Sequence, residues 1–365
     1  MSDAGPPRGA KAPLGGSDVH AVTSVGAHSL HPREFLLDAQ ASTGFLPVCD
    51  HYSGVETRMR KSLQLQAQMT QEFGTCMFDV TLDCEDGAPV GGEKDHAQLV
   101  VALANAAPPG SRVAVRVHPV DHPSFEQDVE IVAGGAGARL CHVMIPKAES
   151  PADIERAARA LDAAGATGLP LHALIESPAA LHRAFDIAAH PRLQSLSFGL
   201  MDFVAAHGGA IPSDAMGIAG QFAHPLVVRA KTEISSACHA HGKVPSHGVV
   251  TEFRDRDAFA QAARRAAREF GYTRMWSIHP DQIRPILEAF APAPHEIDIA
   301  AGIITAAAAA RWAPIQFAGK LEDRASYRYY WQVLERAHQT GRRLPQEVQG
   351  WFSRPDDHNT QGDIA

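Results

Sequence analysis

The sequence predicts a protein of the α/β class, a (β/α)8 TIM barrel followed by a helical C-terminal extension. Eight short apolar runs alternate with helical segments over roughly 250 residues, as expected for eight parallel strands and their crossover helices. The chain contains no GxGxxG or GxxxxGK phosphate loop, which would favour an open doubly wound sheet. Ionisable residues also follow most of the runs, as they do at the mouth of a barrel, where the carboxyl ends of its strands meet.

The eight apolar runs are expected to form the strands. In chain order they are residues 44–50, 75–83, 112–119, 141–149, 171–177, 193–202, 243–250 and 274–280. Alanine-rich segments of helical character lie between several of them. The segment 151–165 is typical, because proline opens it and glycine closes it, as at the ends of many helices.

The second run ends in a group of acids, in the sequence FDVTLDCEDGAP. In an extended backbone, successive side chains point to opposite faces. One face would contain Phe78, Val80, Leu82 and Cys84, and the other Asp79, Thr81, Asp83 and Glu85. The first face suits a hydrophobic core, whereas the second requires a cation or water.

Alternation also orients the third and fifth runs. The three valines of the third run would face the surrounding helices, so Arg116 would point into the barrel. Glu176 shares the inward face of the fifth run with His172. In the sixth run Gly199 is expected to end the regular strand, so Asp202 is assigned to the mouth by its position alone.

Six of the eight runs end in ionisable residues. They are Asp83, Glu85, Asp86, Arg116, His118, Lys147, Glu149, Glu176, Asp202 and His279. Ligands and catalytic groups converge at the carboxyl ends of barrel strands, so this pattern predicts a functional site. The alternative is that these residues are solvated starts of loops, which are polar in most proteins.

The predicted mouth carries more negative than positive charge. Its acids include Glu85, Asp86, Glu176 and Asp202, and its cations are mainly Arg116 and Lys147. Carboxylates packed together cost several kcal/mol unless a cation or a proton relieves the repulsion. Oxygen ligands suit Mg²⁺, with Mn²⁺ as the second choice, so we expect a site for a hard divalent cation.

Composition limits the remaining function classes. The net charge of −8 provides no basic field for nucleic acid or an anionic membrane, and we expect neither as a partner. Residues 1–30 lack the apolar block of a signal peptide or membrane span and are expected to be a flexible tail, as are residues 353–365. The five widely spaced cysteines suit reduced thiols in a cytoplasmic protein.

Between residues 44 and 340 the chain resembles the HpcH/HpaI aldolase and citrate lyase β-chain family, which includes malyl-CoA lyases. The matching motifs are DCEDG at 83–87, IPKAES at 145–150, IES at 175–177, SIHPDQI at 277–283 and GKLEDRAS at 319–326. Each motif is weak alone, but the five in this order are specific. The resemblance implies a Mg²⁺-dependent carbon–carbon lyase that cleaves or forms a hydroxy acid or hydroxyacyl-CoA thioester, with a 2-oxo acid and an acyl enolate as the other side of the reaction.

The resemblance also implies roles for the residues of the mouth. Glu176 and Asp202 match the metal ligands, and Arg116 matches the arginine that binds substrate and stabilises negative charge. Lys147 lies in the matched IPKAES segment and is expected to contact substrate. By the same resemblance, Glu85 and Asp86 bind metal-bound waters or orient the arginine, and Asp323 is the carboxylate of a mobile lid.

Domain boundaries and assembly follow from the same resemblance. We expect a lyase barrel over residues 31–292, a helical lid and oligomerisation segment over 293–352, and a homotrimer or homohexamer. The expected partner is a small-molecule oxo acid or acyl-CoA. Two departures from the family pattern, Val48 after Pro47 in place of glycine and His118 in place of asparagine, concern the contacts with a thioester.

Two other functions remain open at this stage. Lys147 could be the Schiff-base nucleophile of a metal-independent aldolase, because a desolvated lysine can attack a carbonyl. Nearby acids argue against the low pKa that this chemistry requires. The third reading is a barrel protein that binds an oxo acid or acyl-CoA without turning it over.

Overall fold

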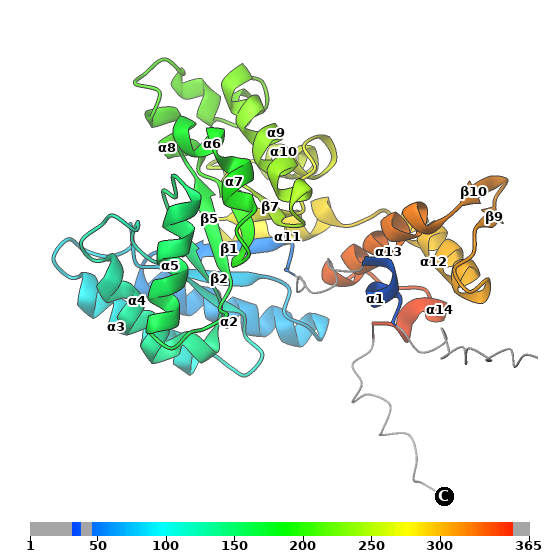
Figure 1. Ribbon diagram of the computed structural model, residues 1–365, viewed down its shortest axis with the longest axis horizontal. Helices are drawn as coiled ribbons and strands as arrows, with labels where there is room; N and C mark the ends of the chain where they lie inside the picture. The colour runs from blue at the N-terminus through cyan, green and yellow to red at the C-terminus, as the bar shows by residue number, and fades with distance from the viewer. Residues whose placement is uncertain (1–30, 38–45, 353–365) are drawn as a thin grey trace, which may run out of the picture.

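Eight parallel strands form a closed barrel in the order β1 to β8, which confirms the predicted fold (Figure 1). The structure is a computed structural model that describes residues 31–37 and 46–352. The tails predicted at 1–30 and 353–365 lie outside the described residues. Each strand except the last pairs in parallel with the next, and β8 closes the barrel by pairing with β1.

The barrel strands are short and lie one per predicted run. They are β1 (Cys49–Ser53), β2 (Asp79–Asp83), β3 (Val113–Arg116), β4 (Leu140–Ile145), β5 (Leu171–Ile175), β6 (Leu193–Phe198), β7 (Val244–His247) and β8 (Arg274–Ser277).

Helices connect the strands and cover the outside of the barrel. They are α2 (Glu56–Phe73), α3 (Glu93–Ala106), α4 (Phe125–Ala136), α5 (Pro151–Ala163), α6 (Pro178–His182), α7 (Ala184–Ala188), α8 (Leu200–Ala205), α9 (Pro225–Ala240), α10 (Arg256–Glu269) and α11 (Pro280–Phe290), with 3-10 turns at η2 (Gly137–Arg139), η3 (Ser213–Met216) and η4 (Gly220–Phe222). Helix α5 begins at the predicted proline, and a capping box between Ser150 and Asp153 caps its N-terminus.

The position of β1 differs from the prediction. The apolar run 44–50 predicted the strand, but β1 begins at Cys49 and ends at Ser53. Asp50 and Tyr52 face the barrel interior, and Asp50 meets Arg274 of β8 with a distance of 2.8 Å between Oδ2 and Nη2. Because the side chains that face the interior here are polar, a search for apolar runs could not place this strand at residues 49–53.

The two faces of β2 are confirmed. Phe78, Val80 and Leu82 are fully buried in the main hydrophobic core between strands and helices. On the opposite face, Thr81 donates a hydrogen bond of 2.6 Å to Asp50, and Asp79 lies 2.7 Å from Arg274. The polar face therefore meets an arginine and a second acid inside the barrel, while its last residue, Asp83, reaches the mouth.

A second hydrophobic core lies beside the barrel and is built from both ends of the described chain (Figure 1). Its helices are α1 (Pro32–Leu37), α12 (Pro294–Ala309), α13 (Arg324–Gln339) and α14 (Gln346–Gln349). Trp331 of α13 is fully buried there, and Arg33 of α1 forms an ion pair with Glu335. Helix α1, which the predicted boundary at residue 31 assigned to the barrel, thus packs with the C-terminal segment.

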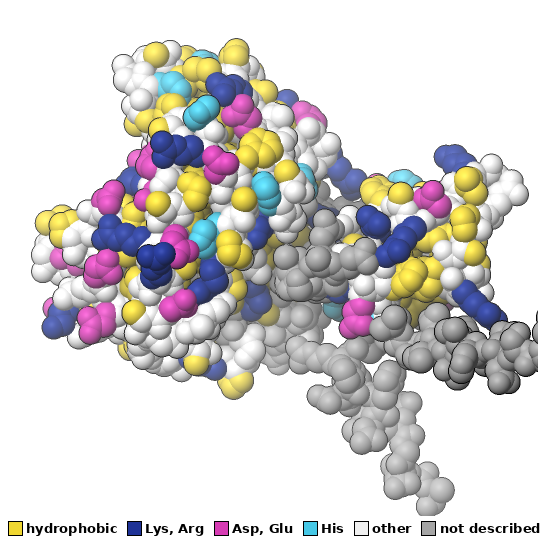
Figure 2. Space-filling view, viewed as in Figure 1, with side chains coloured by type: hydrophobic (Ala, Val, Ile, Leu, Met, Phe, Trp, Pro, Cys, Tyr) yellow, Lys and Arg dark blue, Asp and Glu magenta, His cyan; other side chains and the backbone are white. Residues whose placement is uncertain are grey.

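A short antiparallel hairpin extends from this second core. Its strands are β9 (Ile315–Phe317) and β10 (Lys320–Glu322), and it projects on the side remote from the barrel (Figure 1). Among the described helices, none combines the length and the apolar character that crossing a membrane requires. Basic and acidic side chains are interspersed over the visible face of the barrel (Figure 2).

Candidate active site

Arg116, the last residue of β3, is buried among three carboxylates at the mouth of the barrel. Its Nε donates to Asp83 Oδ1 at 2.7 Å, and its Nη2 donates to Asp83 Oδ2 at 2.9 Å. Nη2 also donates to Asp86 at 2.8 Å, and Nη1 lies 3.0 Å from Glu85 Oε2. The inward direction predicted for Arg116 is confirmed, and the guanidinium is held in one orientation by charge-assisted bonds.

Asp83 accepts most of the hydrogen bonds in this cluster. Besides Arg116, it accepts hydrogen bonds from the Tyr52 hydroxyl at 2.6 Å and from the backbone N–H groups of Glu85 and Gly87 at 3.1 and 2.9 Å. Burial alone would raise the pKa of this carboxyl, but the bonds from Arg116 and Tyr52 outweigh burial and lower it. Asp83 therefore stays ionised and keeps the arginine fixed.

Lys147 joins the arginine cluster to the next acid. Its Nζ lies 2.7 Å from Glu85, and its backbone N–H donates to Glu176 Oε1 at 2.9 Å. The backbone of Lys147 is left-handed, with φ of 50°, an uncommon conformation for a residue other than glycine. Partial burial opposes the charge, yet the contact with Glu85 outweighs it and raises the pKa of Lys147. The ammonium is thus protonated at neutral pH.

Glu176 and Asp202 come together at the ends of β5 and β6. Their side chains are close enough to share a hydrogen bond. Gly199 makes room for them, because a Cβ at this position would lie 2.6 Å from Glu176 Oε2. Burial, followed by the negative charge of Asp202, raises the pKa of Glu176 to about 8. Among the described residues neither carboxylate forms an ion pair, although the negative charge of both contributes to the raised pKa of Lys147.

This carboxylate pair fits a hard divalent cation. Mg²⁺ is commonly held by one or two protein carboxylates, with water and substrate oxygens completing its shell. Glu176 is buried and Asp202 lies in the first turn of α8, so both are positioned by rigid elements. A cation would replace the proton that the raised pKa of Glu176 indicates, and would relieve the repulsion between the two acids.

Comparison with known proteins agrees with this geometry. Residues 62–280 match the family model described as HpcH/HpaI aldolase/citrate lyase. The chain belongs to this family. The family includes carbon–carbon lyases, and the chain is an enzyme of that class.

Three known proteins show the extent of the similarity. The L-malyl-CoA/beta-methylmalyl-CoA lyase of Cereibacter sphaeroides is 31% identical over 251 residues, which cover 64% of this chain and 77% of that protein. The crystal structure of a citrate lyase from Burkholderia xenovorans LB400 is 48% identical, with a TM-score of 0.72, and covers 89% of this chain and 99% of that chain. CitE from Mycobacterium tuberculosis, solved in complex with magnesium, acetoacetate and coenzyme A, shares the fold at 22% identity, with a TM-score of 0.59 over 80% of this chain and 98% of that chain.

The structure brings six of the seven predicted site residues of this family member into one cluster. They are Glu85, Asp86, Arg116, Lys147, Glu176 and Asp202. Asp323 is the exception. It caps helix α13 by accepting hydrogen bonds from Ala325 N at 2.9 Å and Ser326 N at 3.4 Å. It lies between helix α13 and the hairpin β9–β10, which projects away from the barrel (Figure 1).

Two aromatic residues of the mouth were missed by sequence reasoning. Tyr52 binds Asp83, and its ring lies 5.1 Å from the Arg116 guanidinium carbon. Trp276 of β8 stacks on Tyr52, with 5.8 Å between the ring centres and 15° between the planes. Alternation along β1 would have placed Tyr52 on the inward face, but only once the strand had been located at residues 49–53.

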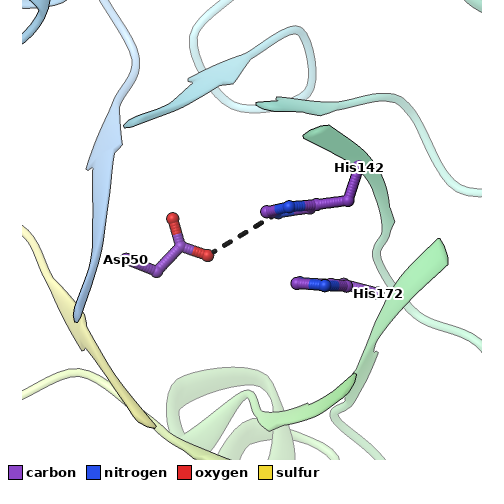
Figure 3. A group of neighbouring side chains, drawn as sticks. All are labelled: Asp50, His142 and His172. Atoms are coloured by element: carbon purple, nitrogen blue, oxygen red, sulfur yellow. Dashed lines mark ion pairs between the residues drawn. The ribbon is translucent and has the colours of Figure 1, made fainter. Parts of the chain in front are cut away.

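A second polar cluster lies deeper in the barrel and is not suited to a metal (Figure 3). Asp50, His142 and His172 offer three ligand atoms within 4.8 Å of one another. The two imidazoles are stacked 3.5 Å apart at 13°, so their in-plane lone pairs run nearly parallel and do not converge on one ion. Arg274 already neutralises Asp50 at 2.8 Å. Burial lowers the pKa of both histidines, which leaves them neutral beside this ion pair.

Proposed function

We propose that this protein is a Mg²⁺-dependent carbon–carbon lyase that acts on a hydroxy acid or hydroxyacyl-CoA, or that forms it in the reverse direction. The observation that carries the proposal is the Glu176–Asp202 pair, adjacent to the Arg116–Asp83 pair in a member of a lyase family. The magnesium in the related CitE structure supports the choice of metal. Mn²⁺ would satisfy the same oxygen ligands.

The bound ion would supply Lewis acidity to the hydroxyl and carboxylate oxygens of the substrate. Glu176 and Asp202 would hold it through their carboxylates, while Lys147 keeps Glu176 in place through its backbone N–H. Glu85 contacts both Arg116 and Lys147, Asp86 contacts Arg116, and both acids would accept hydrogen bonds from water at the ion.

Arg116 would stabilise the enolate that carbon–carbon cleavage releases. Four of its five N–H donors are engaged by Asp83, Glu85 and Asp86, so one N–H of Nη1 remains for a substrate oxygen. A preorganised cationic donor of this kind stabilises a transition state by roughly 3–4 kcal/mol. Lys147, which reaches toward the solvent with 45% of its side chain exposed, would provide the second positive contact.

The proton at the enolate carbon would come from Asp323 of a neighbouring subunit. In its own chain Asp323 is exposed and follows a hairpin that projects away from the barrel, so a role in catalysis would require a homotrimer or homohexamer in which the hairpin covers another mouth. The flanking Leu321 is 76% exposed, as expected for a hairpin that packs against another surface.

Substitution of the carboxylate pair tests the metal site. We expect Glu176→Gln and Asp202→Asn to weaken Mg²⁺ binding at least tenfold in calorimetry while leaving the circular dichroism spectrum unchanged. Glu155→Gln, at a surface glutamate of α5 that pairs with Arg159, is the matched control and should bind Mg²⁺ as the parent does. Unchanged Mg²⁺ binding in both variants would contradict the assignment of Glu176 and Asp202 as metal ligands.

A substrate screen tests the reaction. Glyoxylate, pyruvate and oxaloacetate, each with and without acetyl-CoA, would be incubated with Mg²⁺ and followed for condensation or cleavage. The Schiff-base alternative is disfavoured by the raised pKa of Lys147, and borohydride trapping with a keto acid would detect it directly. Binding of an oxo acid without any turnover would instead support the non-catalytic alternative.

A further inference from the structure

Five side chains form an apolar wall next to the charged residues of the mouth. They are Tyr52, Met144, Leu174, Val249 and Trp276, and they pack together as a hydrophobic cluster separate from the two main cores. They come from β1, β4, β5, the segment after β7, and β8. We refer to these five residues as the apolar wall.

The apolar wall touches the groups that would bind substrate. Met144 is the register partner of Arg116 on the adjacent strand, and Leu174 lies two residues before Glu176 on the same face of the chain. The ring of Tyr52 lies 5.1 Å from the Arg116 guanidinium carbon. Any substrate held by Arg116 and Glu176 therefore has the wall as its neighbour.

The wall also retains access to solvent. Tyr52 and Val249 are only partly buried, whereas Met144 is fully buried. Since inward-facing side chains near the strand ends of a closed barrel reach solvent through its mouth, this exposure indicates that the wall lines the space where substrate would lie.

The wall offers little to a polar group. The Tyr52 hydroxyl is committed to Asp83 at 2.6 Å, so this residue presents its ring. Trp276 Nε1 is buried without a hydrogen-bond partner and is the single polar side-chain atom of the wall left unpaired. One neutral N–H does not compensate for the desolvation of a carboxylate.

The charges of the mouth lead to the same conclusion. The cluster of site residues contains five acids, Asp83, Glu85, Asp86, Glu176 and Asp202, and two cations, Arg116 and Lys147. Both cations already pair with acids of the mouth. With all five acids ionised the excess is three negative charges, and a divalent ion would reduce it to one. The mouth can thus accept one substrate carboxylate at the ion and Arg116, but a second one would meet negative charge and an apolar surface.

We infer that the substrate carries an apolar group, and not a second carboxylate, on the carbon chain next to its metal-binding hydroxy acid or oxo acid. The apolar wall selects this group through Tyr52, Leu174, Val249 and Trp276. The inference rests on the proposed function, because that function places the hydroxy acid at Glu176, Asp202 and Arg116.

Two hydroxy acids of the same shape provide the test. Malate and 2-hydroxy-4-methylpentanoate differ in that a carboxylate of one is replaced by an isopropyl group of similar size in the other. Their dissociation constants would be measured by calorimetry on the full-length protein with saturating Mg²⁺. We expect the isopropyl compound to bind at least about tenfold more tightly, because only this compound avoids burying an unpaired charge.

The outcomes separate this inference from the proposed function. If malate binds as tightly as the isopropyl compound or more tightly, in a Mg²⁺-dependent manner, the metal site stands and the inference is overturned. If neither compound binds while Mg²⁺ itself does, the proposed hydroxy-acid chemistry fails, and the inference fails with it.

A charge placed in the wall provides an independent check. Val249 is partly exposed and follows the end of β7, so Val249→Lys is tolerated sterically and puts an ammonium beside the predicted apolar group. We expect this variant to lose most of the preference for the isopropyl compound and to gain affinity for malate. Val249→Ile, which keeps the wall apolar, is the matched control. If the ratio of the two dissociation constants were unchanged in a folded Val249→Lys protein, the apolar group of the substrate would not lie beside Val249.

Discussion

Arg116 shows how one side chain can be both a functional and a structural element. Its guanidinium satisfies Asp83 through two bonds and contacts Glu85 and Asp86, and all but 8% of its side chain is buried. Because buried charges are costly unless paired, the arginine and the acids depend on each other. The same pairing leaves one N–H of Nη1 without a partner among the described residues, so the group that would bind substrate is also the one that stabilises the acids.

We predict that Arg116→Met lowers the free energy of unfolding by about 3–5 kcal/mol, because it leaves Asp83 buried without a cation. Arg116→Lys keeps the charge but loses the two-pronged contact and should cost less stability, while reducing turnover by about 100-fold or more. Urea denaturation and steady-state kinetics measure the two effects. Arg60→Met, which removes an exposed pair with Glu56, is the control and should change stability by less than about 1 kcal/mol.

At the scale of elements, the loop between β2 and α3 has no room for a side chain at Gly87. A Cβ there would lie 2.1 Å from the carbonyl oxygen of Gly54 and 2.8 Å from that of Asp83. We predict that Gly87→Ala destabilises the protein by about 1–3 kcal/mol, because backbone must move to admit the methyl group.

The control for this prediction is Gly134→Ala in helix α4. A Cβ at Gly134 has its nearest neighbour at 4.0 Å, and alanine favours helix over glycine by about 1 kcal/mol. This variant should therefore be neutral or more stable in thermal denaturation. If Gly87→Ala were as stable as Gly134→Ala, the close approach of Gly87 to the Gly54 carbonyl would not restrict this position to glycine.

Asp323 can be dissected because asparagine and alanine remove different properties. Asparagine keeps the N-cap of α13 but loses the carboxylate, whereas alanine loses both, at a cost of about 1 kcal/mol. We predict a large loss of turnover in both variants and a loss of stability in Asp323→Ala alone. If Asp323→Asn turned over substrate as fast as the parent protein, Asp323 would act only as the N-cap of α13.

A mixing experiment tests whether Asp323 acts on a neighbouring barrel. Subunits carrying Asp323→Asn would be exchanged with subunits carrying Glu176→Gln, and turnover of the mixture would be compared with that of each variant alone. Partial recovery is expected, because some mixed sites combine an intact metal pair with an intact hairpin. No recovery after demonstrated subunit exchange would restrict each hairpin to its own chain.

For the whole molecule, buried histidines predict acid sensitivity. Burial lowers the pKa of His142, His247 and His51, the last to about 4, and burial together with Arg274 lowers that of His172 to about 3. The unfolded chain therefore binds more protons than the folded one below the ordinary histidine pKa of about 6.5. Stability should fall as pH decreases from about 6.5 to 4.

The size of the effect identifies its cause. Each of these four histidines contributes at most about 1.4 kcal/mol per pH unit to the slope of unfolding free energy against pH. Chemical denaturation at several pH values measures this slope, and His142→Asn should reduce it if that variant folds. A flat profile between pH 6.5 and 5 would show that the histidines are protonated in the folded protein.

Local sequence patterns predicted the eight barrel strands, the inward face of β2, β3 and β5, and the grouping of Arg116 and Glu176 at the mouth. These features follow from local alternation and from the place where each strand ends, both of which are written in neighbouring residues. The assignment of Glu176 and Asp202 as metal ligands came from the family resemblance, and Asp202 was placed at the mouth by its position alone.

Other features depend on residues far apart in the sequence and could be identified only from the folded structure. The strand at Cys49–Ser53 carries Asp50 inward because Arg274, more than two hundred residues later, neutralises it. Helix α1 joins the C-terminal core through the ion pair of Arg33 with Glu335, and Asp323 follows a hairpin that projects away from the barrel. Apolar periodicity reports only whether a residue is buried, whereas a buried charge is stabilised by its particular partner, and the partner is defined by the fold.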